Sequence, residues 1–240
     1  MAGHSKWKNI QNRKGAQDAK RGKIFQKMSR EIYVVAKSGG DDPDTNPALR
    51  LAIDKSKSMN VPNDVIQRAI DKATGAGADE NYEEVIYEGY GPGGVAVLVY
   101  CLTENRNRTA PNVRVAFNKN GGSMGESGSV SYLFERKGRL FIERTVEMDE
   151  DTVMLTALEA GAEDIMNTEE GFEILTIPTD FLAVKEAFEA ENFPLLSAEI
   201  DMIPSVYAEL SKEQEEQFEK MIDALEEDDD VQDIFHNAEI

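Results

Sequence analysis

The chain has 240 residues, of which 40% are hydrophobic and 30% charged, with a formal net charge of −20 and a single cysteine, Cys101. The apolar share excludes a disordered chain, the lone cysteine excludes an internal disulfide framework, and the longest apolar run, residues 95–102, is too short to span a membrane. Taken alone, a net charge of −20 also argues against a protein that binds nucleic acid.

The first predicted element is a helix from about Asp18 to Lys37, because its apolar residues recur at helical spacing along one face. A neighbouring sector of the same helix is basic and holds Lys20, Lys23, Lys27 and Arg30. This helix therefore offers one face to a hydrophobic core and another to an anionic partner.

Two further helices are predicted before the chain changes character. Asn46 is suited to an N-cap and Pro47 to the first helical position, which predicts a helix through about Met59. Pro62 begins a third helix, and Gly75 ends it. We expect these three helices to form one small domain.

Beyond residue 77 the pattern predicts a mixed α+β structure. Strands are expected on both sides of a glycine-rich turn at 91–94, followed by a helix, a mobile Gly/Ser-rich crossing and a hairpin around Lys137–Gly138. The predicted ranges are 84–90 and 95–103 for the strands, 110–118 for the helix, 121–129 for the crossing, and 130–135 and 139–144 for the hairpin.

Together with the strand at 139–144, the remaining elements predict a strand–helix–strand–strand–helix–strand order, which is the ferredoxin-like arrangement. They are a helix at 150–160, strands at 164–168 and 172–177, a helix at 179–189 and a strand at 197–204. A last helix at 212–226 and a strand at 231–236 need a sheet to join, and the earlier α+β unit is short of strands. We therefore predict a basic helical domain at 1–78, an α+β domain at 79–129 plus 206–240, and an inserted ferredoxin-like domain at 130–205.

The charge is distributed very unevenly along the chain. Residues 1–37 hold ten Lys or Arg and two acidic residues, a net +8, whereas residues 145–240 hold three basic and twenty-nine acidic residues, a net −26. Such asymmetry is typical of a basic arm or domain with a polyanionic partner, although charged ends also serve solubility alone.

No motif supports an enzyme. Residues 89–94 fit the letters of a dinucleotide fingerprint but precede a strand, so no helix N-terminus faces a phosphate. The two histidines, His4 and His236, lie at opposite ends of the chain, which makes a catalytic triad improbable, and one cysteine with two histidines cannot build a structural zinc site. Cys101 is most simply a core residue. We expect no cofactor, no metal and no small-molecule substrate.

The segment from Ala2 to Lys14 concentrates groups that suit nucleic acid. Lysine and arginine neutralise phosphates, serine donates hydrogen bonds to phosphate oxygens, and tryptophan stacks on a base or ribose. Trp7 also suits a structural role, in which it packs the arm onto the helical domain. The predicted nucleic-acid-binding residues are His4, Ser5, Lys6, Trp7, Lys8, Arg13, Lys14, Lys20, Lys23 and Lys27, with a second cluster at Arg106 and Arg108.

Several blocks of the sequence resemble the YebC/PmpR family signature. They are residues 2–10 (AGHSKWKNI), 46–50, 87–94 (YEGYGPGG), 103–109 (TENRNRT) and 117–122 (FNKNGG). The resemblance runs over nearly the whole chain and implies three domains: a helical one, followed by two α+β domains with interleaved connectivity. It agrees with the insertion argued above, so the predicted fold class is α+β, a three-helix domain followed by two ferredoxin-like α+β domains.

The resemblance implies a cytoplasmic, DNA-binding transcriptional regulator without enzymatic activity. Some relatives are instead described as translation factors acting at the ribosome, so binding to ribosomal RNA is the alternative, and the cluster at Arg106 and Arg108 then matters as much as the arm. A third hypothesis is a protein-interaction module that uses the acidic domains. No membrane partner is expected.

Overall fold

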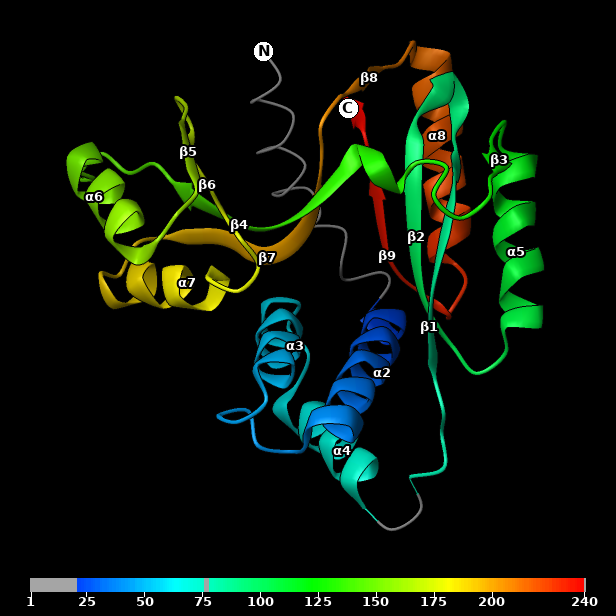
Figure 1. Cartoon of the computed structure of the whole chain (residues 1–240), viewed down its shortest axis with the longest axis horizontal. Coiled ribbons are helices and arrows are strands. Elements are labelled where there is room, and N and C mark those ends of the chain that lie inside the picture. The colour runs from blue at the N-terminus through cyan, green and yellow to red at the C-terminus, as the bar shows by residue number, and fades with distance from the viewer. Residues whose placement is uncertain (1–20, 76–77, 240) are drawn as a thin grey trace. The chain divides into compact units, whose positions relative to one another are not determined.

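The computed structural model describes residues 21–75 and 78–239, and these residues form two compact units (Figure 1). One unit consists of residues 134–205. The other combines the described residues before 134 with those from 206 onward. The second unit is thus assembled from segments on both sides of the first.

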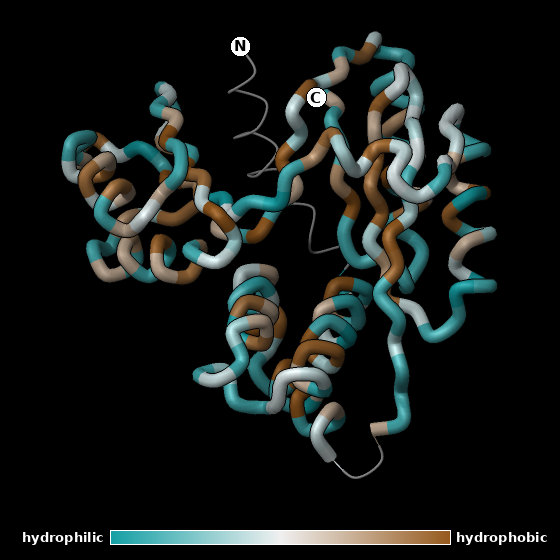
Figure 2. The backbone as a smooth tube through the Cα atoms, viewed as in Figure 1, coloured by the Kyte–Doolittle hydropathy of each residue, from teal (hydrophilic) through white to brown (hydrophobic). Residues whose placement is uncertain are grey.

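The described part of the larger unit begins with a bundle of three helices, α2 (Arg21–Gly39), α3 (Pro47–Ser58) and α4 (Asn63–Thr74). Their buried apolar residues form one cluster that includes Ile32, Leu49 and Ile70. In Figure 2 these helices show hydrophobic and hydrophilic segments in alternation, as amphipathic helices do. The bundle is therefore held by the apolar faces that the sequence predicts.

Asn46 explains why α3 begins where it does. Its side-chain oxygen accepts a hydrogen bond from the backbone N–H of Leu49 at 3.1 Å, which caps the helix. Its amide nitrogen donates to the carbonyl oxygens of Val35 and Gly40, both at 2.9 Å. One side chain thus caps α3 and ties its start to the end of α2.

The α+β part of this unit is a four-stranded antiparallel sheet with the order β3-β1-β2-β9. Its strands are β1 (Glu83–Tyr90), β2 (Ala96–Thr103), β3 (Ser123–Met124) and β9 (Val231–His236). The turn between β1 and β2 contains Gly93 and Gly94 at φ +72° and +76°, a region that favours glycine. A short parallel pair, β8 (Ala208–Glu209) and β10 (Ala238–Glu239), completes the unit.

Helices α5 (Arg106–Lys119) and α8 (Lys212–Glu226) contribute to the core of this sheet. Alternate residues of β2, among them Val97, Val99 and Cys101, are fully buried and cluster with Phe117 of α5 and Phe218 of α8. Because β9 pairs with β2, residues that follow the inserted unit in the chain complete the sheet that precedes it.

The smaller unit has the ferredoxin-like order, with the antiparallel sheet β5-β6-β4-β7. Its elements are β4 (Phe134–Glu143), α6 (Glu150–Ala160), β5 (Asp164–Asn167), β6 (Gly171–Thr176), α7 (Phe181–Ala190) and β7 (Leu195–Pro204). Its buried residues include Leu140, Phe172 and Phe188. The larger unit also has a four-stranded sheet with two helices, but its strands and helices follow a different order along the chain.

The predicted hairpin around Lys137–Gly138 is wrong, because both residues lie within one continuous strand, β4. A Cβ on Gly138 would stand 2.2 Å from the hydroxyl of Thr176 and 2.6 Å from the ring of Phe181. The glycine is therefore needed for close packing between β4, β6 and α7 and not for a turn.

Helix α5 begins four residues earlier than predicted. The side chain of Asn105 accepts hydrogen bonds from the N–H groups of Asn107 and Arg108 and caps the helix there. Pro111 lies inside the helix on its exposed side. The glycine-rich crossing also contains a short strand, β3, where Ser123 pairs with Tyr90.

The predicted fold class is confirmed: the chain is α+β, with a three-helix domain and two sheet-containing domains of interleaved connectivity. The predicted bounds of the last helix and strand, 212–226 and 231–236, match α8 and β9. The domain boundaries stay a prediction. Among the helices of the described ranges, none has the length and apolar character needed to cross a membrane.

Candidate nucleic-acid interface

Eight of the twelve residues predicted to bind nucleic acid lie outside the described part of the chain: His4, Ser5, Lys6, Trp7, Lys8, Arg13, Lys14 and Lys20. The structure describes the other four, Lys23, Lys27, Arg106 and Arg108. Both lysines are on α2, and both arginines are in the first turn of α5. All four belong to the larger unit.

The basic face of α2, defined here as Lys23, Lys27 and Arg30, meets an acidic turn of the same unit. This acidic turn is Glu226–Asp230, at the end of α8. Lys23 pairs with the carboxylate of Glu227 and donates to its carbonyl oxygen at 3.1 Å, and Lys27 donates to the carbonyl oxygen of Glu226 at 3.2 Å. Burial lowers the pKa of Lys27, although nearby carboxylates, Glu226 foremost, oppose the shift.

Arg30 extends this contact toward the sheet. It donates to the carbonyl oxygens of Asp229 at 2.6 Å and Leu102 at 2.9 Å, and to the carboxylate of Asp230 at 3.1 Å. Its guanidinium also lies 4.9 Å from the centre of the Tyr82 ring. Arg30 was predicted to lie on the basic face of this helix but not among the residues that bind nucleic acid.

Asp230 is the buried centre of this network, with only 2% of its side chain exposed. Besides Arg30 it accepts hydrogen bonds from Arg108 at 2.7 and 2.9 Å, from Thr109 at 2.7 Å and from Thr103 at 3.0 Å. Burial by itself raises the pKa of Asp230, but the hydrogen bonds from Arg108, Thr109 and Thr103 outweigh it, so the pKa lies below its usual value. Asp230 is therefore a charged structural anchor.

A second charged cluster, made of three partly buried side chains, joins the bundle to the sheet. Lys55 of α3 contacts Glu31 of α2 at 3.0 Å and Asp233 of β9 at 2.9 Å. Burial alone lowers the pKa of Lys55, but Asp233 and Glu31 more than compensate and raise it. Burial raises the pKa of Glu31 despite the nearby ammonium group. Sequence reasoning missed this triad because its members are far apart in the chain.

The two predicted arginines of α5 differ in their surroundings. The guanidinium of Arg108 is bound to Asp230, whereas Arg106 is exposed and, among the described residues, forms one long ion pair of 3.7 Å with Glu83. The whole of α5 carries four cations and no carboxylate: Arg106, Arg108, Arg114 and Lys119. This helix is thus a second basic surface within the larger unit.

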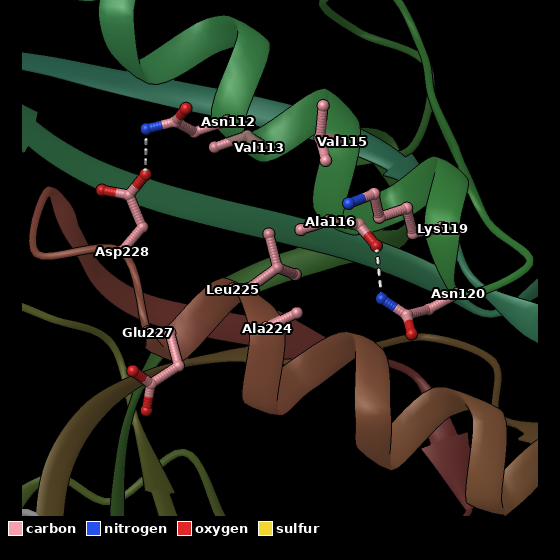
Figure 3. Close-up of a pocket in the computed structure, with 10 residues that line it drawn as sticks. All are labelled: Asn112, Val113, Val115, Ala116, Lys119, Asn120, Ala224, Leu225, Glu227 and Asp228. Atoms are coloured by element: carbon pink, nitrogen blue, oxygen red, sulfur yellow. Dashed lines mark hydrogen bonds between the residues drawn. The ribbon is translucent and has the colours of Figure 1, made fainter.

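The described pockets do not gather catalytic groups. A groove of about 410 Å³ between α5 and α8 is lined by residues such as Val115, Lys119 and Asp228, and a hydrogen bond of 3.0 Å from Asn112 to Asp228 crosses one end (Figure 3). Within the described ranges, no three His, Cys, Asp or Glu side chains are arranged to hold a metal ion. Cys101 is buried, and burial raises its pKa to about 12, so the thiol is not an activated nucleophile.

Together these features define a three-domain α+β protein in which a basic helix meets an acidic turn. The chain belongs to the TACO1/YebC family. The model of the family's N-terminal domain matches residues 5–76, and the model of its second and third domains matches residues 82–238.

Relatives match along the full length of the chain. A probable transcriptional regulatory protein of Geobacillus sp. (strain WCH70) is 61% identical over 240 residues, which cover 100% of this chain and 98% of the relative. A protein of the same description from Enterococcus faecalis is 60% identical and is covered over 99% of its length. The crystal structure of a conserved hypothetical protein from Aquifex aeolicus shares 45% identity and a TM-score of 0.79, and the match covers 93% of this chain and 92% of that one.

Proposed function

We propose that this protein is a non-enzymatic, cytoplasmic regulator of gene expression that binds nucleic acid, with DNA as its target, through its basic N-terminal domain. The observation that carries the proposal is the segregation of charge, a net +8 on residues 1–37 of a chain whose total is −20. Phosphate contacts are short-ranged at physiological salt, so a basic domain binds a polyanion even in an acidic protein. The relatives described as probable transcriptional regulatory proteins support this role.

The proposed contacts divide by chemistry. The lysines and arginines of the arm and of α2 neutralise phosphates, whereas Ser5 and His4 donate hydrogen bonds that fix the position of the backbone. Trp7 stacks on a base or ribose. About five phosphate contacts give a slope of log K against log salt near −4 to −5.

Titration of a fluorescein-labelled DNA duplex at several salt concentrations tests this proposal. Replacing Lys6, Lys8 and Lys14 by glutamine is expected to reduce the magnitude of the salt slope by about 2 to 3. The matched control removes the same charge from exposed positions outside the proposed site, Lys57, Arg68 and Lys220. A salt-insensitive affinity, or equal behaviour of the two triple variants, contradicts the proposal.

The second candidate is a translation factor that docks on ribosomal RNA. It is favoured by α5, whose four cations without a carboxylate form a basic surface separate from α2. Co-sedimentation with ribosomes distinguishes the two candidates, since a promoter-binding regulator stays in the supernatant. Under this candidate, Arg106→Gln together with Arg114→Gln weakens ribosome binding as much as the arm variant does.

A further inference from the structure

The contact between the three-helix bundle and the sheet of the larger unit is polar. The hydrophobic cluster of the bundle and the cluster between the sheet and its helices have no residue in common. Among the described residues, the contacts that cross include those of the basic face of α2 with the acidic turn and with the carbonyl oxygen of Leu102, and those of Lys55 with Asp233. Such contacts are weakened by salt and by competing anions, unlike apolar packing.

The basic face of α2 contacts oxygen acceptors with negative charge, which are also the groups that a nucleic-acid backbone presents. Its three cations contact carboxylate and carbonyl oxygens of Glu227, Glu226 and Asp229. The last carbonyl groups of α8 lack partners within the helix and lie at the negative end of its dipole, so they add to the charge of the side chains. The acidic turn is thus an anionic ligand that the chain itself supplies.

We infer that the acidic turn occupies the phosphate-contacting face of α2 and that nucleic acid must displace it to bind there. The inference rests on the proposed function and adds its regulation: the turn is an intramolecular competitor. It suppresses weak, non-specific binding. Because the turn is part of the same chain, its effective concentration at α2 is high, and a polyanion contacts the lysines only when it binds them more strongly than the turn does.

Asp230 stays in place during this exchange, and Glu226, Glu227 and Asp229 of the acidic turn give up their contacts with α2. Asp230 retains its hydrogen bonds from Arg108, Thr103 and Thr109 when Arg30 turns to a phosphate, so no buried carboxylate is left without donors. Glu227 is 64% exposed and Asp229 is also exposed, so both side chains return to water when the turn is displaced. The displacement therefore leaves the core of the sheet intact.

The test compares two variants of the full chain with equal charge. The turn variant carries Glu226→Gln, Glu227→Gln and Asp229→Asn, and the control variant carries Glu213→Gln, Glu216→Gln and Glu219→Gln on the same helix. Glu213 lies about 20 Å from Glu227 along the helix, at 1.5 Å per residue. Binding of a fluorescein-labelled 20-base-pair DNA duplex and of an RNA hairpin is measured by anisotropy from low to high salt.

The turn variant is expected to bind about three- to tenfold more tightly than the control variant at low salt, with the advantage vanishing at high salt. Equal affinity of the two variants overturns the inference. The proposed function is then still tested separately by the replacement of Lys6, Lys8 and Lys14 by glutamine. Absence of binding by wild type and all variants overturns the proposed function together with the inference.

A crosslink gives an independent readout. The double variant Lys23→Cys, Glu227→Cys places two thiols across the contact, and a bismaleimide linker holds the turn against α2. The crosslinked protein is expected to bind DNA more weakly than the same double variant with its cysteines blocked singly by N-ethylmaleimide. The loss of affinity should be at least as large as the gain of affinity that the turn variant shows over the control variant. Unchanged affinity after crosslinking contradicts the inference.

Discussion

Replacement of Asp230 by asparagine removes the charge at the centre of the buried network while it keeps the size of the side chain. Arg108, Arg30, Thr103 and Thr109 all donate to this carboxylate, and an amide has one acceptor oxygen and an NH₂ group that cannot accept. A buried charge that loses its partner costs about 3–5 kcal/mol, and the half-exposed Arg108 recovers part of that in water. We therefore expect the variant to lose about 2–4 kcal/mol of unfolding free energy.

Urea unfolding followed by circular dichroism measures this loss, and hydrogen exchange of the β2 and β9 amides assigns it to the larger unit. Asp229→Asn is the matched control, because that residue is exposed and only its carbonyl oxygen contacts Arg30. If the two variants differ by less than about 0.5 kcal/mol, Asp230 is not the anchor that its contacts indicate.

The same carboxylate predicts a pH dependence. The folded-state pKa of Asp230 lies below its ordinary value, so its contribution to stability is complete above the unfolded pKa of about 3.9 and is lost as the pH falls through the folded pKa. The difference in stability between wild type and Asp230→Asn should therefore shrink below about pH 4. A difference that stays constant down to pH 3 contradicts a charged Asp230 in the folded protein.

Three further predictions concern packing and charge elsewhere. Gly138→Ala is expected to destabilise the smaller unit by about 1–3 kcal/mol, because the new Cβ would stand 2.2 Å from the Thr176 hydroxyl. Gly22→Ala meets nothing within 4 Å and should stabilise α2 by about 0.5–1 kcal/mol. Thermal unfolding in which both substitutions change the stability in the same direction refutes this prediction. Cys101 should react with a thiol reagent at pH 8 only as fast as the protein unfolds, and rapid labelling of the native protein contradicts its burial and raised pKa. Lys55→Met should cost about 2–4 kcal/mol at pH 7, because two carboxylates lose their shared cation. Burial raises the pKa of Glu31, so this cost should shrink as the pH falls and Glu31 takes up a proton; a cost that does not change with pH in urea unfolding argues against the triad.

Local signals in the sequence account for most of the elements. The Asn46–Pro47 pair predicts the start of α3, and the continuous apolar run at 95–102 predicts β2, a strand that is buried on both faces. These predictions succeed because caps and periodicity act between residues within one or two turns of each other. The same reasoning misplaced the hairpin at Gly138, because a glycine needed for close packing has the same appearance in a sequence as one needed for a turn.

The candidate site divides in a similar way. The sequence alone predicts that α2 has a basic face and that the chain ends in an acidic domain. It does not predict that Lys23 meets Glu227, 204 residues away, or that Asp230 binds Arg108, 122 residues away.

By itself, then, the sequence determined which segments form helices and strands, which faces are apolar, and that positive and negative charge are segregated. Only the tertiary structure decided where these charges go, because β9 pairs with β2 and brings the acidic turn at the end of α8 against α2. Local propensity acts over a few residues, whereas the partner of a charged face depends on which distant strands share a sheet.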